Sequence, residues 1–107
     1  MTIARVWRAT ATAEGAAAYR EHFTGSVLPA LRGLGGQRGA YLFQRESDGR
    51  VELEVMTLWD SLSAIRAFAG DDLTTAVVEP DARAVLLDFD ETVSHRTVVV
   101  DTVNPRP

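Results

Sequence analysis

Residues 58–70, Leu58-Trp59-Asp60-Ser61-Leu62-Ser63-Ala64-Ile65-Arg66-Ala67-Phe68-Ala69-Gly70, decide the fold. An apolar strand ends at the start of this stretch, a short helix follows it, and a glycine ends the helix. Asp60 or Ser61 can accept hydrogen bonds from the first free N–H groups of the helix. Gly70 suits the left-handed position after the helix, where a Cβ atom would be strained. The stretch therefore predicts a strand, a tight turn and a capped helix.

The same stretch also predicts which side of the helix is buried. Trp59 and Ala64 have the spacing of a hydrophobic staple, in which the residue before the cap packs against the first helical turn. Helical periodicity then places on one apolar face Leu62, Ile65 and Phe68 or Ala69.

Upstream of this stretch, the sequence predicts a strand over residues 3–9 and a helix that begins at Thr12, its expected N-cap. Pro29 lacks the N–H group that would bond the carbonyl of Gly25, so the helix should kink or restart there. His22 lies beside the apolar stripe of this helix and is predicted to be exposed. The stripe itself consists of Ala16, Tyr19, Phe23 and Val27.

Two more strands, over residues 40–46 and 51–59, flank Asp48-Gly49, a dipeptide typical of tight hairpin turns. Beyond Gly70, a second short helix is expected from Pro80 to about Leu87. A last strand is expected over residues 93–100. The order strand, helix, strand, strand, helix, strand is typical of the ferredoxin-like α+β fold, with both helices on one face of an antiparallel sheet.

The strands carry apolar residues on both faces, as in the runs 41–43 and 98–100. An antiparallel sheet with one solvated face should alternate more cleanly. We therefore expect a second copy of the chain to cover the helix-free face. The expected assembly is a homodimer in which two sheets form an α/β barrel.

The composition narrows the class of protein. A chain of 107 residues forms one domain, expected over residues 1–100 with a tail over 101–107. The net charge of −4 and the scattered arginines argue against nucleic-acid binding. No apolar run approaches the roughly 20 residues of a membrane-spanning helix, and there is no cysteine. These features favour a cytoplasmic protein that does not associate with membranes.

The sequence resembles the antibiotic biosynthesis monooxygenase (ABM) domain family of the dimeric α/β-barrel superfamily. The resemblance rests on Trp59-x-Ser61-x-x-Ala64-Ile65-Arg66-Ala67-Phe68-Ala69-Gly70-x-Asp72, with support from residues 3–8, 38–41 and 93–95. It implies a small enzyme that works without a cofactor on an aromatic or polyketide-like molecule. Separately, the two histidines are far apart in the sequence and there is no cysteine, which argues against a metal site. The haem-degrading branch of the family uses a first-strand asparagine, a second tryptophan and a histidine that this chain lacks, so haem binding is not expected.

His95 is the candidate catalytic residue, because the near-neutral pKa of histidine lets it accept a proton at physiological pH. A cofactor-free oxygenase needs such a base to form the electron-rich anion that reduces O₂. The alternative for His95 is a half-buried structural residue bonded to a neighbouring strand or loop.

The candidate substrate-binding residues are mostly aromatic, since small-molecule pockets are largely apolar. Arg5 or Arg8 could bind a carboxylate or phenolate, and alternation along the strand turns one of the two inward. Each aromatic residue could instead be core, which is the favoured role for Trp59. The aromatic candidates are Trp7, Tyr19, Tyr41, Trp59 and Phe68.

The leading hypothesis is a cofactor-independent oxygenase of bacterial secondary metabolism. Two alternatives stay open: a non-oxidative cyclase, isomerase or decarboxylase that uses the same pocket, and a non-catalytic ligand-binding or dimeric accessory protein.

Overall fold

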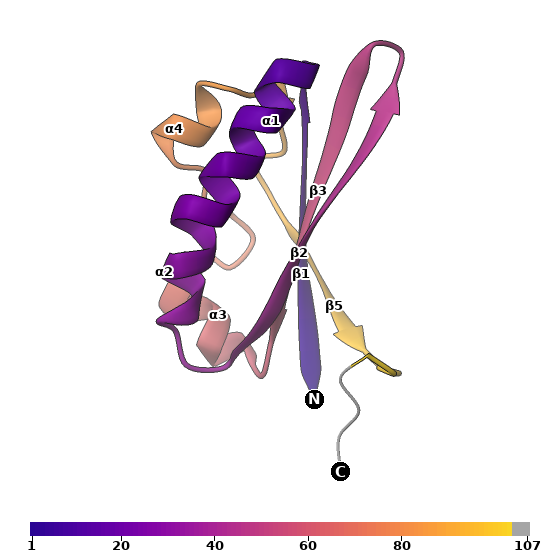
Figure 1. Ribbon diagram of the computed structural model, residues 1–107. Helices are drawn as coiled ribbons and strands as arrows, with labels where there is room; N and C mark the ends of the chain where they lie inside the picture. Colours follow the sequence, from indigo (N-terminus) through magenta and orange to yellow (C-terminus); the bar gives the residue numbers. More distant parts are fainter. Residues whose placement is uncertain (104–107) are drawn as a thin grey trace.

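The computed structural model describes residues 1–103. One antiparallel sheet carries all of the helices on the same face, so the molecule has two layers (Figure 1). This arrangement confirms the predicted ferredoxin-like α+β fold. The elements in chain order are β1 (Thr2–Ala11), α1 (Ala13–His22), the π-helical turn η1 (Phe23–Val27), α2 (Leu28–Arg32), β2 (Gln37–Ser47), β3 (Arg50–Trp59), α3 (Leu62–Ala69), α4 (Pro80–Arg83), β4 (Asp88–Phe89) and β5 (Ser94–Val98).

The strand β1 lies in the middle of the sheet. It pairs with β3 along one of its sides and with β4 and β5 along the other. The two short strands share that side. Phe89 of β4 pairs with Ala9, and His95 of β5 pairs with Arg5. Between β4 and β5, the chain turns away from β1. The last strand, predicted over residues 93–100, is shorter than expected: it begins at Ser94 and ends at Val98, which pairs with Thr2 at the start of β1.

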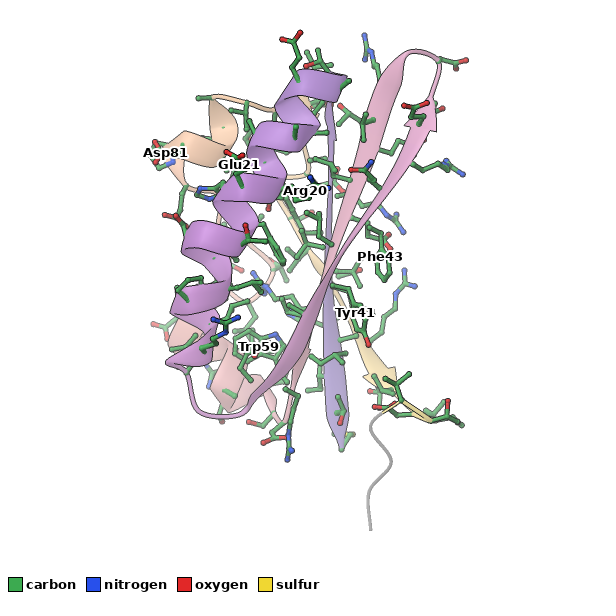
Figure 2. All side chains as sticks on the ribbon, viewed as in Figure 1. Arg20, Glu21, Tyr41, Phe43, Trp59 and Asp81 are labelled. Carbon is green, nitrogen blue, oxygen red and sulfur yellow. The ribbon has the colours of Figure 1, made fainter. Side chains whose placement is uncertain are left out.

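The two faces of the sheet differ in what covers them. Arg5 and its neighbour Thr57 on β3 face the helices and are buried. Trp59 also points to the helix side, whereas Tyr41 and Phe43 point away from it (Figure 2). The alternation predicted for β3 is confirmed, since Val51, Leu53, Val55, Thr57 and Trp59 are all buried.

The predicted helix and turn signals are confirmed. The Thr12 hydroxyl accepts a hydrogen bond from the Gly15 N–H at 3.0 Å, and the Ser61 hydroxyl accepts one from the Ala64 N–H at 3.1 Å. Asp48 and Gly49 have the positive φ angles of the predicted hairpin turn, 52° and 78°. These bonds and angles fix where the chain enters and leaves the sheet.

Gly70 also has the predicted positive φ, 83°. Its ψ of −167° lies outside the left-handed helical region, so the chain leaves α3 in an extended direction instead of turning back. The positive φ still favours glycine there.

The first helix changes its pitch before Pro29, where an interruption was predicted. The Leu28 N–H bonds to the Phe23 carbonyl, five residues earlier, and this widens the turn over η1. Pro29 then lies in the first turn of α2, where its missing N–H costs little. The stripe of Ala16, Tyr19 and Phe23 is buried as predicted.

Two predictions about the helices were wrong. Leu62 is 47% exposed, although it was assigned to the buried face of α3. At 3.6 residues per turn, Leu62 and Phe68 are about 120° apart, and the helix buries the Phe68 side. The helix α4 ends at Arg83 instead of Leu87.

No helix among residues 1–103 is both long enough and apolar enough to cross a bilayer.

The predicted tail, residues 101–107, falls mostly outside the described part of the chain, which ends at residue 103. Val99 and Val100, which the sequence assigned to the last strand, lie outside β5 and are 88% and 78% exposed. They lack the pairing partner that β1 provides to β5.

Candidate functional site

A cavity of about 80 Å³ lies between the sheet and the helices and opens to the surface. Its floor comes from β1 and β3, and its walls come from the helices and from the irregular segment before α4. Most of the lining is apolar, as expected for a small-molecule site. The cavity is lined by Arg5, Trp7, Tyr19, His22, Val27, Ala30, Leu31, Val55, Thr57, Phe68, Val77, Val78, Glu79, Ala82 and Val93.

Arg5 is the buried cation of this site, with only 4% of its surface exposed. Its Nη1 donates to the Leu73 carbonyl at 2.6 Å, and its Nη2 donates to the Thr75 carbonyl at 2.9 Å. The Phe68 ring centre lies 6.0 Å from Arg5 Cζ. Burial lowers the pKa of Arg5, but an arginine side chain stays protonated in proteins. Of the two arginines on β1, Arg5 and not Arg8 therefore faces the cavity.

Two short segments hold the carbonyl partners of Arg5 in place. The Ala76 N–H bonds to the Glu91 carbonyl, and the Val93 N–H bonds to the Thr74 carbonyl, both at 2.8 Å. The chain can make these bonds because it leaves β1 between β4 and β5. The segment that carries the Leu73 and Thr75 carbonyls is thereby fixed against the sheet, beside the cavity.

His95 lies outside the cavity lining, one hydrogen bond away from it. Its Nε2 is 3.0 Å from Arg5 Nη1. A guanidinium can only donate, so Nε2 is the acceptor and the ring is neutral with its proton on Nδ1. Burial, and then the positive charge of Arg5, lower the pKa of His95. His95 is therefore an unprotonated imidazole whose Nε2 lone pair is occupied by Arg5.

Trp7 and Tyr19 form the aromatic wall of the cavity. The Trp7 indole N–H donates to the Asp90 carbonyl at 2.7 Å, and its ring centre is 5.9 Å from that of Tyr19. Burial, and then the nearby Glu79 carboxylate, raise the pKa of Tyr19 well above its usual value. No hydrogen bond joins the Tyr19 hydroxyl to another residue in the described range. The hydroxyl is therefore free to bond a ligand.

His22 corrects one sequence-based prediction, because its side chain is only 10% exposed and lines the cavity. The packing of α1 against the segment before α4 covers it. His22 Nε2 lies 3.8 Å from Glu79 Oε1, and the two groups face each other across that contact. No local pattern in the sequence predicts Val77, Ala82 or Val93 as lining residues, since each is placed by a contact far along the chain.

Three of the candidate residues lie elsewhere. Trp59 is fully buried core, and its indole N–H donates to the Thr57 hydroxyl at 2.8 Å. Tyr41 and Arg8 lie on the helix-free face, where Arg8 Nε is 2.8 Å from Glu54 Oε1. Of the substrate-binding candidates, the cavity brings together Arg5, Trp7, Tyr19 and Phe68.

Within residues 1–103, no group of three or more His, Cys, Asp or Glu side chains is arranged to hold a metal ion. The titratable groups at the cavity are instead Arg5, Tyr19, His22 and Glu79, with His95 behind Arg5 in the hydrogen-bond chain. The lining thus combines aromatic rings with a buried guanidinium, and the imidazole of His95 is bonded to that guanidinium.

In sequence, the chain matches no protein-family model and no curated protein. In structure, it is similar to a Bacillus cereus protein provisionally named an antibiotic biosynthesis monooxygenase. That match has a TM-score of 0.66 at 15% identity and covers 96% of this chain and 98% of the other. It is also similar to Rv0793 from Mycobacterium tuberculosis, with a TM-score of 0.59 at 18% identity, covering 95% of this chain and 99% of the other. The chain therefore has the fold of these two proteins over nearly its whole length.

Proposed function

We propose that the chain is a cofactor-independent oxygenase that acts on a small aromatic or polyketide-type molecule in bacterial secondary metabolism. The observation that carries the proposal is the cavity, where Trp7, Tyr19 and Phe68 surround the buried Arg5 and the unprotonated His95 adjoins it. The fold shared with the Bacillus cereus protein supports the reaction class. The described residues offer aromatic surface and a base, which are the two requirements of this chemistry.

In this reaction the substrate itself supplies the electrons. His95 takes a proton from a phenol or enol, and the resulting anion transfers electrons to O₂. One oxygen atom enters the substrate as a carbonyl and the other leaves as water. Because Arg5 occupies the Nε2 lone pair, His95 acts as a base only when that hydrogen bond opens. The proposal therefore requires that Arg5 Nη1 release His95 during turnover.

Oxygen uptake tests this proposal. Purified protein with 1,4-dihydroxynaphthalene, a chelator and no added flavin should consume O₂ faster than the same mixture without protein. His95→Ala should lower the rate at least 100-fold, since general-base catalysis typically contributes 10²–10⁴-fold. Thr97→Ala changes an exposed side chain on the same strand and should leave the rate unchanged. Uptake equal to the protein-free rate, or full activity in His95→Ala, would contradict the proposal.

A non-catalytic binding protein is the second candidate. The observation that favours it is the hydrogen bond at 3.0 Å that occupies the only basic nitrogen of His95. A protein of this kind would bind aromatic molecules in the cavity without consuming O₂. A non-oxidative enzyme that uses the same pocket would convert its substrate equally well under nitrogen, which separates it from both of the other functions.

We also propose that the chain works as a homodimer joined through the helix-free faces of the two sheets. Tyr41 and Phe43 stack there with ring centres 5.6 Å apart and are 36% and 44% exposed. This face exposes less apolar surface than the sequence predicted, because Ala4, Val6 and Leu58 are already buried in the single chain. The exposed aromatic pair is what a partner sheet would cover.

A further inference from the structure

Arg5 occupies a costly position. It lies on the central strand of the sheet and is almost completely buried, with 4% of its surface exposed. It also lines the cavity under the helices. Burying a charge is unfavourable unless an opposite charge or a full set of hydrogen bonds compensates for it. The hydrogen-bond partners of Arg5 therefore show whether an opposite charge compensates for its burial.

The partners that the structure gives Arg5 are all uncharged. They are the Leu73 carbonyl, the Thr75 carbonyl and the neutral His95 ring. The ion pairs found within residues 1–103 belong to other side chains, namely Arg8, His22, Arg38 and Arg45. The positive charge of Arg5 is thus met by dipoles and by no carboxylate of the described chain.

The guanidinium of Arg5 also has more N–H donors than its three hydrogen bonds use. It carries five N–H groups, and its three bonds use two on Nη1 and one on Nη2. The Nε–H and the second Nη2–H make no hydrogen bond with any residue that the structure describes. Two N–H groups of one guanidinium match the two oxygens of a carboxylate, which makes such pairs both strong and specific.

We propose that the cavity selects an anionic aromatic ligand, whose carboxylate is bound by Arg5 while its ring packs against Trp7 and Phe68. The inference rests on the proposed function for its ligand site and adds the charge of the ligand. The cavity of about 80 Å³ is smaller than the roughly 150 Å³ of an engineered cavity that encloses benzene, so it cannot enclose the whole ligand. The charged head enters, and the ring lies toward the open mouth.

Two probes of the same shape test the charge requirement. Benzoate and benzyl alcohol share the ring, and only benzoate carries a carboxylate. Isothermal titration of the wild-type protein at neutral pH and low salt should give a dissociation constant at least tenfold lower for benzoate. Equal affinities, tighter binding of benzyl alcohol, or no binding of benzoate would overturn the inference.

Variants then locate the preference. Arg5→Gln should abolish the preference for benzoate, whereas Arg50→Gln, an equal loss of charge at the exposed start of β3, should retain it. Circular dichroism reports whether Arg5→Gln is folded. If it is not, Arg5→Lys keeps the charge without the two-pronged geometry and should bind benzoate more weakly than wild type but still in preference to benzyl alcohol. Wild-type affinity for benzoate in a folded Arg5→Gln protein would overturn the inference.

The outcome can be separated from that of the proposed oxygenase activity. Oxygen uptake with neutral 1,4-dihydroxynaphthalene together with no benzoate preference would support the oxygenase and overturn the anion site. Benzoate preference that depends on Arg5, without any oxygen uptake, would support the anion site and contradict the oxygenase.

Discussion

Arg5 and Arg8 lie three residues apart on one strand and have opposite environments. Arg5 is buried under the helices, whereas Arg8 is exposed on the other face and pairs with Glu54. The sequence predicts that they face opposite ways, because side chains alternate along a strand. It does not predict which one is buried, because Trp7 and Val6, their same-face neighbours, are both apolar. The packing of distant helices decides that question.

At the residue scale, His95 should have a lowered pKa in the folded protein. Burial and the positive charge of Arg5 both disfavour the imidazolium. The unfolded chain, with a pKa of about 6.5, then binds the proton more readily. The stabilising contribution of neutral His95 is therefore present above about pH 6.5 and is lost as the pH falls through the folded-state pKa.

An NMR titration of the His95 ring measures this shift. The folded wild-type protein should titrate below the ordinary histidine value, and Arg5→Gln should move the midpoint upward because the repelling charge is gone. A wild-type midpoint at or above the ordinary value would show that Arg5 does not donate to Nε2.

At the scale of elements, the signals that the sequence carries within a few residues were confirmed. The cap at Thr12, the cap at Ser61 and the Asp48-Gly49 turn each depend on atoms at most four residues apart. Such features require no knowledge of the rest of the chain. They are enough to define the order of strands and helices, and this order defines the fold.

Features that depend on distant contacts were not predictable. The strand β4 was not predicted, and it is separate from β5 because residues 91–93 bond to residues 74–76 instead of to β1. These bonds place Val93 in the cavity wall and bring two carbonyls to Arg5. The burial of His22 also depends on a distant contact, with Glu79. The cavity is therefore built from pairings that no local pattern in the sequence indicates.

A glycine near the start of α1 allows this helix to approach the segment after α4. A Cβ atom on Gly15 would collide with the Val85 carbonyl oxygen, a backbone atom that cannot move aside cheaply. Gly15→Ala should therefore lower the free energy of unfolding by about 1–3 kcal/mol, the usual cost of overpacking. Urea denaturation followed by circular dichroism measures it.

Gly25→Ala is the matched control. A Cβ atom on Gly25 meets nothing within 4 Å, and the residue lies on the exposed side of η1. This substitution should leave stability unchanged or raise it by up to about 1 kcal/mol, because alanine loses less backbone freedom on folding. Equal effects of the two substitutions would contradict the assigned contact between Gly15 and Val85.

At the scale of the whole molecule, the helix-free face combines a polar end with an apolar patch. Arg8–Glu54 and Arg45–Glu52 pair at one end of it, and the stacked Tyr41 and Phe43 project beside them. We expect sedimentation equilibrium to give twice the 11.7 kDa mass of the single chain. Fully burying an exposed phenylalanine side chain contributes about 1.5–3 kcal/mol, and each Phe43, 44% exposed in the single chain, would contribute part of that in the dimer.

Phe43→Asp tests this interface, because it removes the ring and adds a charge. It should weaken dimerisation at least tenfold, since about 1.4 kcal/mol corresponds to a factor of ten. Leu62→Asp is the control, because Leu62 is similarly exposed but lies on α3, on the opposite side of the sheet. A wild-type protein that sediments as a single chain at micromolar concentration would contradict the proposed dimer.

The central claim is that a small aromatic molecule binds in the cavity under the helices. The two indole N–H signals test it most directly in one NMR spectrum, because Trp7 lines the cavity and Trp59 is buried in the core outside its lining. Titration with benzoate should shift the Trp7 signal strongly and the Trp59 signal little. Two unmoved signals, or shifts confined to the backbone of Tyr41 and Phe43 on the other face, would contradict the account.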